Sequence, residues 1–372
     1  MKLKLLKLYD YRNCSNVELP FNFSKNLIIG KNAQGKTNIL ESIYFLSTLK
    51  SPRTPNQLEF INFDKPQFRI EAEISKLQTD ISLSYAYNSD KKRSMLVNGV
   101  KSGIKNFKSI LKTVLFSSSD LLLLRGAPQD RRDWLDRAIA QVYPAYDERL
   151  TKYDKIRVQK NNFLKDALKS GYLDNSLLDV YNEQLSVCGS NIIFIRKKYI
   201  KEIEKLAKVK HGTISNNEVL SLKYECSFLD IYEDDVSDIK DIQSAFLSAL
   251  EEHRTEELRR GQACVGPHRD DVIFFINNLD ATKFASQGQQ RTIVLALKLS
   301  ELDIIAQKTG EQPILLLDDV LAELDDLRQN YLLKSINSET QTIITSVDTL
   351  LFEEDFLKDV DIFKIESGKI VD

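Results

Sequence analysis

The residues from Gly30 to Thr37 have the types and spacing of a phosphate-binding loop. They read Gly-Lys-Asn-Ala-Gln-Gly-Lys-Thr, after the apolar run 27–29 and before the helical periodicity of 39–46. Backbone N–H groups of such a loop point at phosphates, and the next helix adds its positive N-terminal end. The spacing predicts that the Lys36 amine contacts the terminal phosphates and that the Thr37 hydroxyl binds Mg²⁺. The predicted nucleotide contacts are Gly30, Lys31, Asn32, Ala33, Gln34, Gly35, Lys36 and Thr37.

Two adjacent aspartates supply the carboxylates that a nucleotide-bound metal needs. Asp318 and Asp319 end the apolar run 313–317, which has the character of a buried strand. We expect Asp318 to hold Mg²⁺ and Asp319 to orient or deprotonate the attacking water, so that Lys36, Asp318 and Asp319 are the catalytic candidates. The alternative is that both acids only begin a helix.

A second possible anion-binding segment lies far along the chain. Ser286, Gly288 and Gln289 open the long helical run 292–301. A serine and a glycine at a helix N-terminus favour close approach to a phosphate. One nucleotide does not need two such helix ends from one chain.

Segment 286–291 resembles the signature motif of ATP-binding-cassette (ABC) ATPases. In that family the motif contacts the γ-phosphate of a nucleotide held by the other subunit. Residues 322–325 stand where the family has its D-loop, which implies a head-to-tail dimer that encloses two ATP molecules. Alternatively, Glu323 and Asp325 only stabilise the first turn of a helix.

Five further segments, 11–13, 114–121, 131–136, 266–271 and 317–325, resemble the RecF family of bacterial DNA replication and repair ATPases. This resemblance covers residues 5–348. It implies ATP and Mg²⁺ as cofactors, a role near the nucleotide for Arg12, and a trans contact by Ser286, Gly288 and Gln289. It further implies an ATP-dependent homodimer on duplex DNA near single-strand gaps, slow DNA-dependent hydrolysis, and loading of RecA together with RecO and RecR.

The sequence departs from the family pattern in two places. Residues 116–120 read Phe-Ser-Ser-Ser-Asp where the family has Phe-Ser-Pro-Glu-Asp. Residues 345–348, Thr-Ser-Val-Asp, contain no switch histidine such as transporter motors carry, so phosphate sensing falls to Ser346, Asp348 or no residue.

Short strands must position these motifs. Alternation or apolar runs predict strands at 2–8, 27–29, 68–74, 81–87, 95–97, 272–276, 313–317 and 342–345, with a tight hairpin turn at Asn98-Gly99. Helical periodicity dominates the middle of the chain. The predicted fold is an α/β ABC-type ATPase head, a P-loop NTPase lobe, with an inserted, mainly α-helical second lobe. We assign residues 1–119 and 265–372 to the first lobe and 120–264 to the second, with the signature segment near the junction.

Charge restricts where nucleic acid could bind. The chain has 52 Lys and Arg against 54 Asp and Glu, so attraction to DNA requires a local patch. Residues 91–112 contain no acid, and this segment is either a surface that binds the phosphate backbone or only a solvated face. The candidate DNA contacts are Lys91, Lys92, Arg93, Lys101, Lys105, Lys108 and Lys112.

The remaining patterns bound the class of protein. Four cysteines without paired spacing suit a reducing compartment, and no run is long and apolar enough for a membrane span, so we expect a cytoplasmic, nucleoid-associated protein. Three alternatives remain open, namely a stand-alone head of the chromosome-maintenance type, a transporter motor subunit, and a small-molecule kinase. We interpret His268 as a structural hydrogen-bonding residue because no nucleophile or metal ligand accompanies it in the sequence.

Overall fold

The computed structural model describes residues 1–77, 79–215, 218–229, 238–336 and 339–371. The chain forms two compact units, and each is described by itself. Unit 1 comprises residues 1–122, 213–215 and 291–372, and unit 2 comprises 123–212 and 216–290. Helix α9 (Gln287–Thr309) begins in unit 2 and continues in unit 1. Within the described ranges, no helix combines the length and apolar character required to cross a bilayer.

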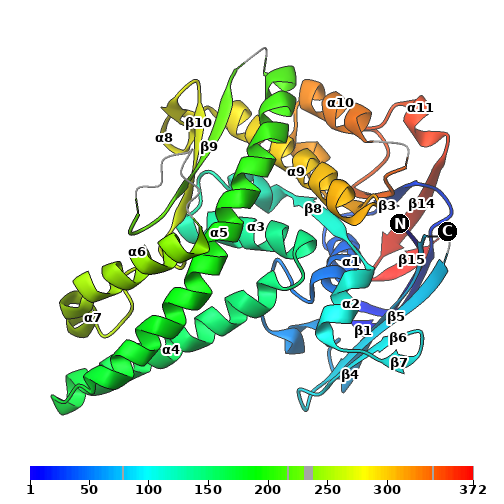
Figure 1. The fold of residues 1–372 in the computed structure, drawn as a ribbon. Helices are drawn as coiled ribbons and strands as arrows, with labels where there is room; N and C mark the ends of the chain where they lie inside the picture. The colour runs from blue at the N-terminus through cyan, green and yellow to red at the C-terminus, as the bar shows by residue number, and fades with distance from the viewer. Residues whose placement is uncertain (78, 216–217, 230–237, 337–338, 372) are drawn as a thin grey trace. The chain divides into compact units, whose positions relative to one another are not determined.

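Unit 1 contains an antiparallel and a mainly parallel sheet (Figure 1). The antiparallel sheet has the order β2-β1-β4-β5-β6-β7, with β1 (Lys2–Tyr11), β2 (Cys14–Pro20), β4 (Gln67–Lys76), β5 (Thr79–Asn88), β6 (Arg93–Val97) and β7 (Val100–Lys101). The other sheet has the order β15-β14-β3-β13-β12-β8, with β3 (Lys25–Ile29), β8 (Thr113–Ser117), β12 (Ile314–Asp318), β13 (Thr342–Ser346), β14 (Val360–Glu366) and β15 (Lys369–Val371). Besides its part of α9, unit 1 contains the helices α1 (Lys36–Thr48), α2 (Ile104–Ile110), α10 (Asp326–Ser335) and α11 (Glu354–Leu357) and the short 3₁₀ turns 57–60, 118–122 and 321–323.

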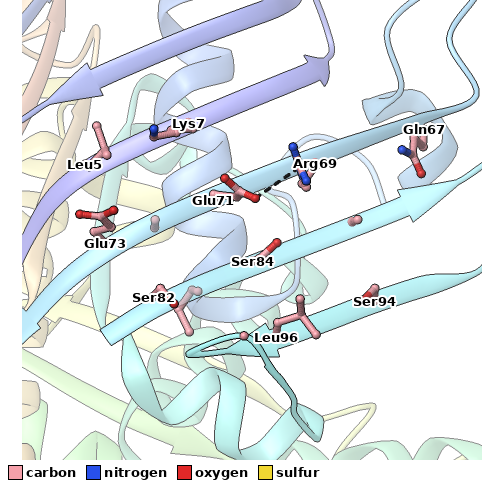
Figure 2. A pocket seen from close by; sticks show the side chains of 14 residues that line it. Leu5, Lys7, Gln67, Arg69, Glu71, Glu73, Ser82, Ser84, Ser94 and Leu96 are labelled. Atoms are coloured by element: carbon pink, nitrogen blue, oxygen red, sulfur yellow. Dashed lines mark ion pairs between the residues drawn. The ribbon is translucent and has the colours of Figure 1, made fainter. Parts of the chain in front are cut away.

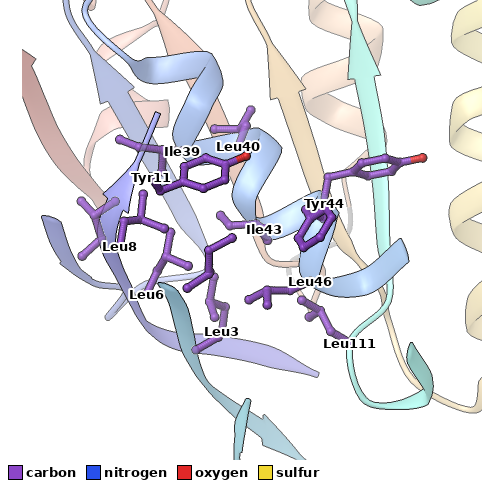
Figure 3. Packing of buried hydrophobic residues seen from close by; sticks show 14 of the residues in the cluster. Leu3, Leu6, Leu8, Tyr11, Ile39, Leu40, Ile43, Tyr44, Leu46 and Leu111 are labelled. Carbon is purple, nitrogen blue, oxygen red and sulfur yellow. The ribbon is translucent and has the colours of Figure 1, made fainter. Parts of the chain in front are cut away.

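Helix α1 packs between the two sheets of unit 1. Its apolar residues recur at helical spacing, and Figure 3 shows Ile39, Ile43 and Leu46 against Leu3 and Leu6 of β1. The same buried cluster includes residues of β12, β13 and β14 from the parallel sheet. Burial of this apolar surface is the main stabilising term for the unit, and it fixes the helix that follows the phosphate-binding loop.

The register of the parallel sheet aligns the carboxyl ends of four strands. Asp318 at the end of β12 pairs with Ser117 of β8 on one side and with Thr345 of β13 on the other. Ser346 of β13 pairs in turn with Ile29 of β3. Because parallel strands end at the same edge, the loop after β3 and the aspartates after β12 are brought together there.

Unit 2 is mainly helical, as expected, but it also contains a sheet. Its elements are α3 (Pro128–Val142), α4 (Tyr146–Ser170), α5 (Asn175–Ile214), β9 (Leu220–Glu225), α6 (Ile239–Glu252), α7 (Arg254–Arg260), β10 (Asp271–Ile276), β11 (Leu279–Asp280) and α8 (Ala281–Phe284). The long helices α4 and α5 lie side by side, with the rings of Phe163 and Tyr181 5.7 Å apart (Figure 1). Strand β10 pairs antiparallel with β9 and β11 in a three-stranded sheet.

The pairing of β10 changes one expected boundary. We assigned residues 265–290 to the first lobe because the apolar run 272–276 resembled another strand of the α/β sheet. In the structure this strand pairs with β9, and residues 265–290 belong to unit 2. The change from unit 1 to unit 2 after Leu122 differs from the expected position by only three residues. An apolar run predicts a strand, but it does not specify which strand it pairs with.

The tight turn predicted at Asn98-Gly99 is confirmed. Strands β6 and β7 pair antiparallel on either side of it, and both turn residues have positive φ angles, 51° and 74°. Two consecutive left-handed residues are the geometry of a type I′ hairpin turn, which Asn-Gly favours.

Candidate nucleotide-binding site

The phosphate-binding loop follows β3 and leads into α1, as its spacing predicts. Gly35 caps α1 with a φ of 112°, in a region that favours glycine. A Cβ atom on Gly30 would lie 2.4 Å from the Ile365 carbonyl oxygen of β14, so this position also requires glycine. The loop is therefore built for close packing of its backbone.

Lys36 is the first residue of α1 and is only 3% exposed. Its amine donates hydrogen bonds to the carbonyl oxygens of Gly30, at 2.7 Å, and Lys31, at 3.2 Å. Both acceptors are neutral, so they orient the ammonium group without neutralising its charge. A buried positive charge that is held by neutral acceptors at a helix N-terminus suits a phosphate ligand.

Thr37 meets Asp318 across the sheet edge. The Thr37 hydroxyl donates to Asp318 Oδ1 at 3.0 Å, although 281 residues separate the two in sequence. A hydroxyl beside a carboxylate is the pair of oxygen ligands that Mg²⁺ takes in phosphate-loop proteins, where waters and phosphates complete the shell. Within the described residues, no cluster of three or more His, Cys, Asp or Glu side chains forms a metal site made by protein alone. The residues present thus fit a Mg²⁺ ion that is bound together with a nucleotide.

Thr345 is a member of this site that the sequence analysis missed. Its hydroxyl lies 3.0 Å from Asp318 Oδ1 and 3.4 Å from Asp319 Oδ1, and it accepts the Asp319 backbone N–H at 2.9 Å. Asp319 has a φ of 51°, and this N–H bond helps to hold its left-handed backbone. The sequence analysis considered Ser346 and Asp348, but Asp348 is exposed and accepts the Leu350 N–H, whereas Ser346 is buried on the strand. The parallel register, Asp318 opposite Thr345, is the signal that identifies the threonine.

The surroundings of Asp318 include some influences that raise the pKa of its carboxyl and others that lower it. Burial raises the pKa of this carboxyl above its ordinary value, and the nearby charge of Asp319 acts in the same direction. Hydrogen bonds from Thr345 and Thr37 oppose that shift because they stabilise the ionised form. The two threonines therefore help to keep the carboxylate charged for a metal.

Arg12 is held by a carboxylate on α1. Its guanidinium donates to both oxygens of Glu41, at 2.6 and 2.8 Å, and lies 4.9 Å from the centre of the Phe60 ring. The Glu41 side chain is 1% exposed. A bidentate pair of this kind fixes the orientation of the guanidinium relative to the carboxylate. This contact fixes Arg12 on the helix that follows the phosphate-binding loop, while its role near the nucleotide stays a prediction.

The signature segment begins α9 in unit 2. The Ser286 Oγ accepts the Gln289 N–H at 3.2 Å, and Gln289 Oε1 accepts the Ser286 N–H at 2.8 Å, which is a reciprocal capping box. The Gln289 amide also donates to Glu218 Oε1 at 2.8 Å. These bonds shape the helix N-terminus around Gly288, and the expected contact with a second subunit stays a prediction.

The segment after the two aspartates has a structural role that the sequence left open. Asp325 caps α10 by accepting the Arg328 N–H at 3.0 Å, and Glu323 pairs with Arg291 at 3.6 Å.

In the segment 116–120, Asp120 accepts the Ser117 N–H at 2.8 Å and pairs with Lys298 at 2.9 Å. The proline and glutamate of the family pattern are thus not needed for this turn to close.

Comparison with known proteins shows the family to which this chain belongs. Residues 2–370 match the family described as RecF/RecN/SMC N terminal domain. The DNA replication and repair protein RecF of Bacillus subtilis (strain 168) is 39% identical over 372 residues, which cover all of both chains. The chain belongs to the RecF family. RecF of Listeria welshimeri is similar at 38% identity, over all of this chain and 99% of that protein.

Solved structures of the RecF family share the fold. The recombination mediator protein RecF-ATPrS in the RecFOR pathway superposes with a TM-score of 0.90 at 33% identity, over 99% of this chain and 97% of that one. RecF-ATP gives the same TM-score over 99% and 96%. An Smc head bound to the C-winged helix domain of ScpA gives a TM-score of 0.55 at 14% identity, over 100% and 98%, which shows the fold alone. The predicted α/β ABC-type ATPase head is confirmed.

The basic segment of this RecF-family chain is only partly exposed. Lys91, Lys92, Arg93, Lys101 and Lys105 are exposed, and Lys108 is half-buried. Lys112 does not fit the expected patch, because it is 6% exposed and its amine donates to the Lys108 carbonyl oxygen at 3.1 Å.

Two arginines of unit 2 outside the basic segment are engaged in hydrogen bonds with acidic residues or their backbone. Arg131 forms a bidentate pair with Asp271 at 2.8 and 2.7 Å, and Arg132 donates to the Asp270 carbonyl oxygen at 2.6 Å. Both belong to the packing of unit 2, because the spacing of charges along a sequence does not show which of them are neutralised.

The structural interpretation of His268 fits its contacts. Its Nδ1 lies 2.8 Å from the Tyr153 hydroxyl, and its Nε2 lies 3.3 Å from the Ala263 carbonyl oxygen. Burial lowers the pKa of His268 from 6.5 to about 3, so the ring stays neutral at physiological pH.

A shallow depression of 460 Å³ lies on the antiparallel sheet of unit 1, over β1, β4, β5 and β6. Figure 2 shows charged side chains of both signs along it, with Lys7 and Glu73 near one end and Arg69 paired with Glu71 at 3.3 Å. Its lining contains no residue of the phosphate-binding loop or of the aspartate pair. The mixed charge does not point to a single class of ligand.

Proposed function

We propose that this chain is an ATP-dependent DNA-binding protein of recombinational repair and replication restart, acting in the cytoplasm at the nucleoid. The observation that carries the proposal is the Thr37–Asp318 contact at the edge of the parallel sheet, next to a buried Lys36. Membership of the RecF family, whose solved members include ATP-bound recombination mediators, supports the choice among phosphate-loop proteins.

The residues of this chain would divide the work of hydrolysis. The loop N–H groups and Lys36 would hold the phosphates of ATP, and Thr37 with Asp318 would hold Mg²⁺. The bound Mg²⁺ would supply positive charge at the phosphoryl oxygens. Asp319 would orient the attacking water and accept its proton, while Thr345 would hold both aspartates in place. Without a switch histidine, we expect hydrolysis to be slow.

ATP would act as a switch for dimerisation. The helix N-terminus at Ser286, Gly288 and Gln289 is proposed to contact the phosphates of an ATP molecule bound to a second copy. ATP then binds the dimer more tightly than the monomer, so it stabilises the dimer by mass action. Hydrolysis removes the shared phosphate and releases the copies. The ABC-type fold and the capped start of α9 support this part of the proposal.

The closed dimer is proposed to hold duplex DNA near a single-strand gap and to help load RecA together with RecO and RecR. A relative of known structure belongs to the RecFOR pathway, which supports the two partners RecO and RecR. The exposed part of the basic segment, Lys91 to Lys105, is the proposed DNA-contacting surface. Such contacts read backbone charge rather than base sequence.

Analytical ultracentrifugation tests the ATP switch. The wild type is compared with Lys36→Ala and with the control Lys2→Ala, which alters an exposed lysine of β1. Each is run with ATP, ADP or neither, with and without duplex DNA. We expect dimers only for the wild type and the control, and only with ATP. A monomer that is indifferent to ATP, or a Lys36→Ala variant that dimerises normally, would contradict the proposal.

The DNA surface needs a separate measurement. Replacing Lys91, Lys92 and Arg93 by Gln should make the negative slope of log affinity against log salt shallower by about 3, at roughly 0.9 per phosphate contact. Lys2→Gln, which removes an exposed lysine outside the basic segment, serves as the control. An unchanged slope would mean that the segment is only a solvated face.

A further inference from the structure

The turn between β14 and β15 contacts the phosphate-binding loop at Gln34. The Ser367 N–H donates to Gln34 Oε1 at 2.6 Å, and the Gly368 N–H donates to the Gln34 carbonyl oxygen at 2.8 Å. The side-chain amide of Asn13 donates a second hydrogen bond to the same carbonyl oxygen at 3.2 Å. One loop residue thus accepts hydrogen bonds from the chain's last hairpin and from the segment after β1.

These contacts hold a part of the phosphate-binding loop whose own backbone is strained. Ala33 and Gly35, on either side of Gln34, have φ angles of 64° and 112°. A non-glycine residue in the left-handed region is unfavourable unless its surroundings hold it there. Gln34 lies immediately before the cap of α1, so a shift of its carbonyl would move the N–H groups that point at the phosphates.

The packing around the turn leaves little freedom. A Cβ atom on Gly368 would lie 2.1 Å from the Asn13 carbonyl oxygen, and a Cβ atom on Gly35 would lie 2.8 Å from the Asn13 side chain. Any side chain at position 368 would therefore push the turn away from Asn13 and Gln34. The contact depends on glycine at 368 for its close approach, in addition to its φ of 72°.

We propose that the β14–β15 turn is a positioning element for the phosphate-binding loop, and that Gln34 is the residue through which it acts. The turn sets the affinity for nucleotide although residues 367 and 368 touch no predicted ligand. By linkage, nucleotide bound to the loop also stabilises the turn. This inference rests on the proposed binding of ATP.

The turn at Asn98-Gly99 provides a matched control for the proposed role of the β14–β15 turn. The turn at Asn98-Gly99 has φ angles of 51° and 74°, and the turn at Ser367-Gly368 has 49° and 72°. Alanine at either glycine meets the same backbone strain. In the part of the chain that the structure describes, however, no atom lies within 4 Å of a Cβ atom on Gly99, so Gly368→Ala adds a clash and Gly99→Ala does not.

The experiment measures ATP affinity by calorimetry in the presence of Mg²⁺ for the wild type, Gly368→Ala and Gly99→Ala. We expect Gly368→Ala to bind ATP about tenfold more weakly, as for the loss of one to two hydrogen bonds, with turnover at saturating ATP unchanged. Gly99→Ala should bind as the wild type does. Hydrogen exchange on the wild type should show that ATP slows exchange of the Ser367 and Gly368 amides and leaves Gly99 unchanged.

A second variant keeps the test decisive if Gly368→Ala does not fold. Gln34→Ala removes the acceptor of the Ser367 N–H, so it should weaken ATP binding and remove the ATP-dependent protection of Ser367. A folded Gly368→Ala with the affinity of Gly99→Ala, or amides at 367 and 368 that exchange equally with and without ATP, would overturn this inference alone. A wild-type chain without affinity for ATP would overturn the proposed function as well.

Discussion

Replacing Thr345 by valine should shift the pH dependence of Mg²⁺-dependent ATP binding. The Thr345 hydroxyl contacts Asp318 Oδ1 at 3.0 Å, and this hydrogen bond lowers the pKa of the Asp318 carboxyl against the effect of burial. Valine has nearly the same shape but cannot donate. In Thr345→Val the pKa of Asp318 should therefore rise.

The size of the shift follows from the geometry. A hydrogen bond to a charged group contributes about 1.5–3 kcal/mol. The single Thr345 proton is also within reach of the Leu317 carbonyl and Asp319 Oδ1, both at 3.4 Å, so we take the lower end of that range. About 1.4 kcal/mol corresponds to a tenfold change in the equilibrium between the protonated and the ionised carboxyl. Mg²⁺ binds the ionised carboxylate, so affinity is lost as pH falls through the pKa of Asp318, and in the variant this loss occurs at higher pH.

Calorimetric titration of ATP with Mg²⁺ at a series of pH values measures the midpoint. Thr345→Ser retains the hydroxyl and should keep the wild-type midpoint. Thr342→Val alters another buried threonine of β13, whose hydroxyl donates to the Thr340 carbonyl at 3.3 Å and forms no hydrogen bond with a carboxylate of the described residues. It should lower stability without moving the midpoint.

The reasoning fails if Thr345→Val has the wild-type midpoint while Thr345→Ser and Thr342→Val are folded. It also fails if Thr342→Val shifts the midpoint as far as Thr345→Val, because the shift would then reflect general loosening of β13. A change in affinity that is equal at every pH would mean that Thr345 only shapes the site.

Three other expected outcomes test the site and unit 2. Asp319→Asn should bind ATP and form longer-lived dimers, with turnover at least about a hundredfold lower in a single-turnover phosphate-release assay; normal turnover would assign the base elsewhere. Arg196 donates to both oxygens of the Asp136 carboxylate, at 2.9 and 2.8 Å. Arg196→Met should lower the free energy of unfolding, measured by urea titration, by about 3–5 kcal/mol because it leaves this carboxylate without its cation. A loss below about 1 kcal/mol would refute this expectation. Wild-type stability should fall as pH drops below 6.5 toward about 3, because the unfolded chain protonates His268 and the folded chain does not. The contribution approaches about 1.4 kcal/mol per pH unit, and urea titrations of His268→Gln should lack it.

Much of the nucleotide site could be predicted from short-range patterns. The loop Gly30–Thr37 needs a preceding strand and a following helix, and both elements can be predicted from local hydrophobic patterns. The aspartates at the end of an apolar run could be paired with Thr37 because carboxyl ends of parallel strands share an edge. In each case a local signal combines with a general rule of sheet architecture.

Interactions that depend on register, pairing or burial could not be predicted in this way. Thr345 became part of the site only through its alignment with Asp318. Lys112 resembles its exposed neighbours in sequence but is buried. Strand β10 has the apolar character of a parallel-sheet strand, yet it pairs with β9.

The chemistry of the predicted site can be inferred from the amino-acid sequence, because the spacing within a phosphate-binding loop and the acids after a strand are local properties. The contacts that hold these residues in place become visible only in the folded unit. The bonds from Ser367 and Gly368 to Gln34 join residues more than 330 positions apart. Such contacts depend on the packing of the whole unit, in which each strand and turn is placed by all of its neighbours at once.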